Sequence, residues 1–269
     1  MTVTGTAAGV PFTALPPVGD GPAPLVVTWH MMDAPCTDAA FAAALPLVGV
    51  EAWRVHLGMP WCGARAYPEG YELSRRDPMM LYVDAVVRQA VEEFPAALVD
   101  LRARFPIVDA PIGVVGGSLG GAVALAATAS GVVPVAALAV VNAAIRASSV
   151  VALISDLSDR PYPWDDASRA AADRLDFVAR AADLNGTALL VVSGDEDYPT
   201  FRADAAALTD AVRGARLIAV PGLAHPLADR PGEEPAPQTP GAKVVDEAIT
   251  AWFTTHLTRA STQDSGSPA

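Results

Sequence analysis

The stretch "APIGVVGGSLGGAVALAA", residues 110–127, sets a single serine, Ser118, among four glycines. The residues before it, Ile112, Val114 and Val115, are of the β-branched kind that favours a buried strand, whereas the residues after it are mainly alanine and leucine, which favour a helix. Flexible linkers also carry glycine and serine, but their flanks are polar. The pattern therefore predicts that the chain passes directly from a strand into a helix through a sharp turn at Ser118.

The glycines around Ser118 indicate how tight this turn is. Gly116 and Gly120 flank the place where the strand and the helix come close, so we expect a side chain at either position to clash. Ser118 itself is expected in a strained backbone conformation that lifts its hydroxyl above the sheet edge. The helix that follows would offer unpaired N–H groups to any negative charge that forms there.

Strands and helices alternate along the rest of the chain. Strands are predicted at 24–30, 50–57, 111–116, 135–141, 188–194 and 215–220. Helices are predicted at 38–45, 78–105, 119–130, 166–182, 200–213 and 243–257, with a kink or a break at Pro95 and irregular chain at 58–77 and 143–165. Because the strands lack polar alternation, this order predicts an α/β fold with a doubly wound, mostly parallel sheet and helices on both faces.

A chain of 269 residues, of which 52% are hydrophobic, can fill one large core. We expect an N-terminal edge segment at 1–23, a single domain at 24–258 and a flexible tail at 259–269. The segment 143–182 is short for a cap, so a small lid or an open cleft is expected. The uncharged run 120–145 is long enough to span a bilayer, but glycine and proline divide it into helix-sized and strand-sized parts, so no membrane span is expected.

Composition limits the partners and cofactors. The formal net charge is -12 and no basic run interrupts it, so nucleic acid and anionic membranes are not expected partners. Cys36 and Cys62 have neither the number nor the spacing of a disulfide scaffold or a zinc site, and whether they pair is left open. No dinucleotide fingerprint or Walker loop is present, so no cofactor and no metal is expected. The N-terminus lacks the features of a signal peptide, which favours a cytoplasmic protein; the oligomeric state is left open.

The "GGSLG" segment fits the G-x-S-x-G pattern, and the chain from about residue 24 to 257 resembles the α/β-hydrolase family. That family orders its catalytic residues as serine, acid and histidine along the chain. Here "GDEDYP" follows one predicted strand and "PGLAHPL" follows the next. The resemblance implies Ser118 as nucleophile, His225 as base and Asp197 as the acid, with Asp195 as the alternative.

The resemblance also implies an oxyanion hole formed by two backbone N–H groups. One would come from Leu119, the residue after the nucleophile, and the other from Met32 in the loop after the strand 24–30, with Met31 as second choice. The family usually has His-Gly at this loop, and this chain has His30-Met31. We expect His30 to brace the loop, and the methionines to narrow the acyl pocket and make it apolar.

These features predict a serine hydrolase. More narrowly, they predict a serine esterase that cleaves small carboxylic esters through an acyl-enzyme intermediate. Its partner would be a small-molecule ester or amide. The alternatives are a serine peptidase resembling prolyl oligopeptidases, a dienelactone-hydrolase-like enzyme, a thioesterase, and a non-catalytic ligand-binding protein of the same fold. The physiological substrate, its acyl-chain length and its stereochemistry are left open.

Overall fold

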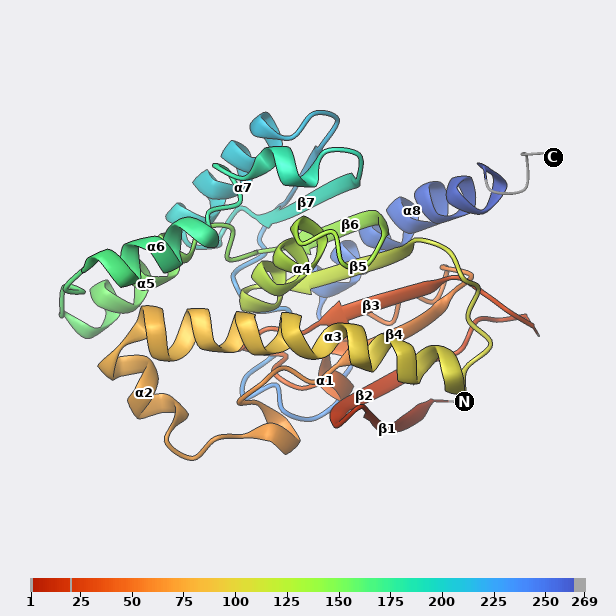
Figure 1. Cartoon of the computed structure of the whole chain (residues 1–269), viewed down its shortest axis with the longest axis horizontal. Coiled ribbons are helices and arrows are strands. Elements are labelled where there is room, and N and C mark those ends of the chain that lie inside the picture. Colours follow the sequence, from red (N-terminus) through yellow and green to blue (C-terminus); the bar gives the residue numbers. More distant parts are fainter. Residues whose placement is uncertain (1, 20, 264–269) are drawn as a thin grey trace.

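The computed structural model describes residues 2–19 and 21–263, and it is built around one eight-stranded sheet with helices on both faces (Figure 1). The strands are β1 (Val3–Ala7), β2 (Val10–Leu15), β3 (Leu25–Trp29), β4 (Trp53–Leu57), β5 (Ile112–Gly117), β6 (Val135–Val141), β7 (Ala188–Gly194) and β8 (Arg216–Val220). Their order across the sheet is β1-β2-β4-β3-β5-β6-β7-β8. Every pair from β4 to β8 is parallel, whereas β1 and β2 pair antiparallel with their neighbours. The predicted fold class is confirmed.

Eight α-helices are found among the described residues. They are α1 (Asp38–Ala44), α2 (Gly70–Arg76), α3 (Asp84–Arg104), α4 (Leu119–Ala129), α5 (Ala147–Ser158), α6 (Asp166–Arg174), α7 (Pro199–Ala211) and α8 (Pro240–Gln263). Three shorter helical segments are Gly63–Arg65, Pro78–Val83, which is a π-helix that leads into α3, and Ala181–Leu184.

Strand residues alternate between two apolar layers, one on each face of the sheet. Val27 of β3 belongs to the layer that the sheet forms with α3, α4, α5, α6 and α7. Its neighbour Val26 belongs to the layer formed with α1 and α8. Because successive strand side chains point to opposite faces, a sheet covered on both sides needs apolar residues at every position. This explains the unbroken apolar runs in the sequence.

The N-terminal segment, predicted to lie at an edge, forms a β-hairpin there. β1 is the outermost strand, and β2 joins it to β4 through pairs such as Phe12 with Leu57. The hairpin turn has positive φ angles at Ala8 and Gly9. The sequence analysis did not identify these two strands, because glycine, proline and threonine interrupt their apolar pattern.

Three helical predictions need correction. The segment 143–165 is not irregular, since it contains α5; Val150 and Ile154 have the helical spacing that the breaker cluster after Ser158 obscured. The helix predicted at 166–182 ends at Arg174. Pro95 does not break the long helix, because α3 continues through it to Arg104.

The predicted loop 58–77 contains α2. At the other end of the chain, α8 continues to Gln263, so the first residues of the segment predicted as a tail are helical, and 264–269 lie outside the described residues. Within the described part of the chain, no helix has both the length and the apolar character needed to cross a bilayer. The uncharged run 120–145 is divided between α4 and β6.

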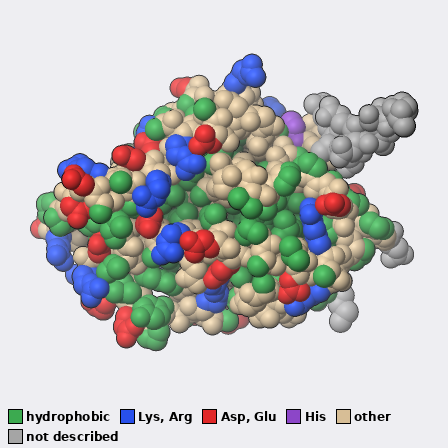
Figure 2. All heavy atoms as spheres, viewed as in Figure 1, with side chains coloured by type: hydrophobic (Ala, Val, Ile, Leu, Met, Phe, Trp, Pro, Cys, Tyr) green, Lys and Arg blue, Asp and Glu red, His purple; other side chains and the backbone are tan. Residues whose placement is uncertain are grey.

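The face shown in Figure 2 carries acidic and basic side chains interspersed with apolar ones. Along α3, for example, Arg104 pairs with Asp100 at 2.7 Å and Arg88 with Glu92 at 3.4 Å. Exposed pairs of this kind contribute only about 0–1 kcal/mol each. The fold is therefore held mainly by the two buried apolar layers.

Candidate active site

Ser118 lies alone between β5 and α4, in a backbone conformation that few non-glycine residues adopt. Its φ is 49° and its ψ is -122°. A Cβ on Gly116 would lie 2.1 Å from the carbonyl oxygen of Gly120, and a Cβ on Gly120 would lie 2.4 Å from that of Trp29. The predicted strain at the serine and the predicted need for glycine on both sides are confirmed. The turn therefore lifts the Ser118 hydroxyl out of the sheet edge.

The structure brings Ser118, His225 and Asp197 into one row of hydrogen bonds. Nε2 of His225 lies 2.9 Å from Oγ of Ser118, and Nδ1 of His225 lies 2.7 Å from Oδ1 of Asp197. All three side chains are buried. A carboxylate can only accept, so the imidazole donates its Nδ1–H to Asp197 and leaves Nε2 to accept the serine proton. Asp195 instead accepts the N–H of Gly222 at 2.7 Å.

The turn after β7 fixes the carboxylate and screens the imidazole. Oδ1 of Asp197 also accepts the N–H of Tyr198 at 2.7 Å, while Oδ2 is buried with no hydrogen-bond partner among the described residues. The rings of Tyr198 and Phe201 lie 5.0 and 5.4 Å from the His225 ring. Aromatic contacts of this kind exclude water from the imidazole and leave its two nitrogens to Ser118 and Asp197.

Asn142, directly after β6, joins the loops that carry the histidine and the acid. Its Nδ2 donates to the carbonyl oxygens of Ala224 and His225 at 2.9 and 3.0 Å, and its Oδ1 accepts the N–H of Gly194 at 2.8 Å. Its φ is 44°, which asparagine tolerates better than most residues. The sequence analysis missed this residue. Its signal was a polar amide at the carboxyl end of a buried strand, where ligands and catalytic groups gather.

The backbone N–H groups of Leu119 and Met32, both close to Ser118, have no hydrogen-bond acceptor among the described residues. Leu119 is the first residue of α4, and Met32 follows β3; both line the same cavity as Ser118. The carbonyl oxygen of Met31 accepts a hydrogen bond from Nδ1 of His30 at 2.6 Å. Because the peptide group is planar and trans, the N–H of Met32 points away from that contact. The Met31 side chain is buried in the layer with α1 and α8, so only Met32 narrows the cavity.

His30 braces this loop, as the sequence analysis expects. Its Nε2 accepts the N–H of Met59 at 2.9 Å, while its Nδ1 donates to Met31. Burial lowers the pKa of His30 to about 4, more than the bond to Met31 raises it, and the charge on Arg65 lowers it further. The imidazole is therefore neutral near pH 7, with its proton on Nδ1.

The cavity over Ser118 has a volume of about 220 Å³ and a mainly apolar wall. Helix α5, within the segment expected to form a lid, contributes Val150, Leu153 and Ile154 to it. At the rim, Asp33 forms a two-point ion pair with Arg230 at 2.6 and 2.9 Å. That guanidinium lowers the pKa of Asp33 and joins the loop after β3 to the loop that carries His225.

The described residues contain no group of three or more histidine, cysteine or acidic side chains arranged to hold a metal ion. Cys36 and Cys62 are free thiols. Burial raises the pKa of Cys62 to about 12, so the thiolate is disfavoured.

Comparison with known proteins finds the same architecture in solved structures. TT1662 from Thermus thermophilus is 20% identical with a TM-score of 0.65, covering 94% of this chain and 98% of its own. An esterase domain from Rhodothermus marinus is 18% identical with a TM-score of 0.60, and the match covers 95% of this chain and 98% of that domain. Est1E from Butyrivibrio proteoclasticus is 15% identical with a TM-score of 0.61, and the match covers 96% of this chain and 99% of Est1E. No protein-family model and no curated protein sequence matches the chain. The sheet order, the strained serine between β5 and α4 and these likenesses lead to one conclusion: the chain has the α/β-hydrolase fold.

Proposed function

We propose that this protein is a serine hydrolase that cleaves small carboxylic esters. The observation that carries the proposal is the row of hydrogen bonds from Ser118 through His225 to Asp197. A serine hydroxyl is a weak nucleophile near neutral pH, and an adjacent imidazole that takes its proton makes it reactive. The carboxylate holds the imidazole in the required tautomer and stabilises its charged form.

The proposed reaction has two halves. His225 Nε2 takes the Ser118 proton as Oγ bonds to the ester carbon, and the carbonyl electron pair moves to oxygen. The N–H groups of Leu119 and Met32 donate to this oxyanion. The C–O bond to the alcohol then breaks and His225 gives its proton to the leaving alcohol. In the second half, His225 takes a proton from water, the hydroxide attacks the acyl carbon, and Ser118 leaves with that proton, releasing the carboxylic acid.

The volume and wall of the cavity support a small, apolar acyl group. About 220 Å³ is less than the 300–1,000 Å³ typical of drug-sized ligand sites. Val150, Leu153 and Phe201 offer no hydrogen bond to a peptide backbone. We therefore rank short esters above peptides and extended thioesters as substrates.

The test is reaction with a fluorophosphonate, followed by mass spectrometry of the modified residue. We expect one adduct, on Ser118, and none in Ser118→Ala. His225→Ala should lower both the labelling rate and kcat by about 10³-fold or more, because the nucleophile loses its base. Ser130→Ala, at the other end of α4, is the matched control and should label like the wild type.

A substrate panel then separates the alternatives. It contains p-nitrophenyl acetate and butyrate, a short acyl thioester, a dipeptide amide and a hydroxycinnamate ester, the last because a structure of Est1E holds ferulic acid. Turnover of the short esters with no amide cleavage is expected. A folded protein that neither labels nor turns over any of them would contradict the proposal and favour a ligand-binding protein of this fold.

A further inference from the structure

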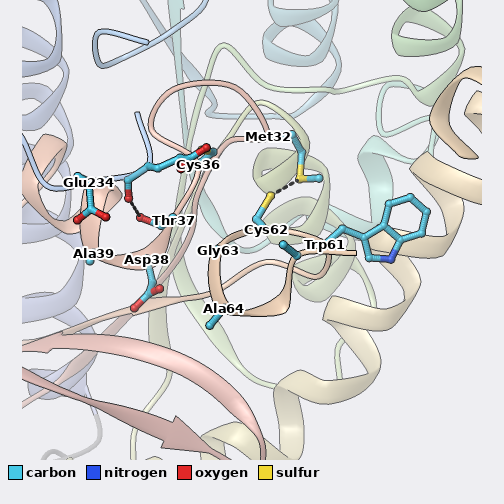
Figure 3. Close-up of a pocket in the computed structure, with 12 residues that line it drawn as sticks. Met32, Cys36, Thr37, Asp38, Ala39, Trp61, Cys62, Gly63, Ala64 and Glu234 are labelled. Atoms are coloured by element: carbon cyan, nitrogen blue, oxygen red, sulfur yellow. Dashed lines mark hydrogen bonds between the residues drawn. The ribbon is translucent and has the colours of Figure 1, made fainter. Parts of the chain in front are cut away.

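A second and larger hollow lies beside the catalytic cavity, between the loop after β3, the segment 61–66 and the loop after His225 (Figure 3). Its volume is about 580 Å³. We call it the second cleft and define it by the lining residues Met32, Asp38, Trp61, Cys62, Glu233 and Glu234. The proposed chemistry above makes no use of it.

The second cleft and the catalytic cavity have a lining residue in common. Met32 lines both, and its sulfur accepts a weak hydrogen bond from the Cys62 thiol at 3.5 Å (Figure 3). Trp61 of the cleft packs on Tyr82 of the catalytic cavity, with ring centroids 5.9 Å apart. A methionine side chain is flexible and adapts to its neighbours. The flexible Met32 side chain therefore lies at the boundary of both hollows.

The charged side chains that line the described part of the cleft are all acidic. Asp38, Glu233 and Glu234 line it, and none of the described residues that line it is lysine or arginine. The nearby Arg65 is paired with Glu93 at 2.7 Å. The Trp61 ring points away from these acidic side chains (Figure 3) and packs against Tyr67 and Tyr82. An anionic group in this cleft would meet repulsion, with no lysine or arginine among the described lining residues to compensate it.

We propose that the second cleft is the subsite for the alcohol part of the ester, and that it accepts uncharged or cationic alcohols and rejects anionic ones. The inference rests on the proposed function, because it places the acyl group in the smaller apolar cavity at Ser118. The released alcohol would leave through the second cleft. Met32 then acts on both parts of the substrate: its N–H meets the oxyanion and its side chain separates the two subsites.

The first test compares three acetate esters whose alcohols have similar size and different charge: acetylcholine, 3,3-dimethylbutyl acetate and 4-acetoxybutanoate. We expect kcat/KM for the first two to exceed that for the third by about tenfold or more, because charge inside a cleft is felt strongly. In Glu233→Gln/Glu234→Gln this ratio should shrink several-fold, with 3,3-dimethylbutyl acetate little changed. The control Glu51→Gln/Glu247→Gln changes the net charge equally at exposed sites outside the cleft and should keep the ratio.

The second test blocks the space. Ala64 lines the cleft, and Ala64→Phe should lower kcat/KM for 3,3-dimethylbutyl acetate at least fivefold while leaving methyl acetate within twofold. Ala103→Phe, an exposed position on α3, is the matched control. Equal effects on both esters, or none on either, would overturn the assignment of the alcohol to this cleft.

The two proposals fail in different ways. If short neutral esters are hydrolysed but the charge ratio is absent or insensitive to the Glu233/Glu234 variant, the subsite is wrong and the esterase stands. If no ester is hydrolysed and Ser118 is not labelled, the proposed function is wrong. Saturation-transfer NMR with choline and 4-hydroxybutanoate then tests the cleft directly: choline binding that weakens in Glu233→Gln/Glu234→Gln supports it, and equal signals from both alcohols overturn it.

Discussion

At the scale of single residues, the contact between strand and helix at Ser118 depends on the absence of side chains. The space that a Cβ on Gly116 would need is occupied by the backbone of Gly120 and Gly121, at 2.1–2.6 Å. Backbone atoms cannot rotate away as the end of a flexible side chain can. The strained φ of Ser118 persists because these contacts leave the turn no alternative.

Gly116→Ala should therefore move α4 relative to β5. We expect the free energy of unfolding to fall by about 2 kcal/mol or more, and fluorophosphonate labelling of Ser118 to slow at least tenfold. Urea unfolding and labelling kinetics measure the two effects. Gly19→Ala, where a Cβ would meet nothing within 4 Å, should change stability by less than about 0.5 kcal/mol. Equal stability of the two variants would show that the close approach has no energetic role.

At the scale of elements, the site depends on the ends of five parallel strands that meet at one sheet edge. β3 precedes the Met32 loop, β5 precedes Ser118, β7 precedes Asp197 and β8 precedes His225. β6 contributes Asn142, whose amide joins the end of β7 to the histidine loop. This amide therefore holds the loops that carry His225 and Asp197 in a fixed relation.

Asn142→Gly tests that role, because glycine tolerates the positive φ and only the amide is lost. We expect kcat to fall about 10–100-fold with KM changed less than twofold, since imidazole misplacement affects the transition state more than substrate binding. A variant with lower thermal stability but unchanged kcat would reduce Asn142 to a purely structural residue.

At the scale of the whole molecule, two neutral histidines are buried between the layers of the fold. Burial lowers the pKa of His56 to about 3 and that of His30 to about 4, and the Arg54 charge adds to the effect at His56. The ordinary pKa is 6.5, so the unfolded chain binds protons that the folded chain refuses between pH 6.5 and about 4. Stability is therefore full above pH 6.5 and is lost as the pH falls through this window.

We expect each histidine to contribute about 1.4 kcal/mol per pH unit to this loss. Urea unfolding at pH 7.5, 6.5, 5.5 and 4.5 measures the slope. In His56→Gln the slope between pH 6 and 4.5 should be shallower than in the wild type by about that amount, whatever the variant's stability at pH 7.5. If the free energy of unfolding falls with pH at the same slope in the wild type and in His56→Gln, His56 is protonated in the folded protein.

The sequence by itself determined the parts of this protein that follow from local patterns. Unbroken apolar runs at 135–141 and 188–194 were sufficient to place strands, and the sterics of Gly116 and Gly120 were sufficient to place the turn at Ser118. The chain order of Ser118, "GDED" and His225 narrowed the site to a few residues. It could not choose between Asp195 and Asp197 from the residues alone, because both follow the same strand.

Only the tertiary structure decided which groups meet across the sheet edge. It placed Asp197 against His225, made Asn142 a link between two loops, and set Met32 between the catalytic cavity and the second cleft. It also formed α5, whose apolar residues gain a partner only when they cover the cavity. Steric and periodic preferences act between near neighbours in the chain, whereas these contacts join residues 28 or more positions apart or depend on packing that no local pattern records.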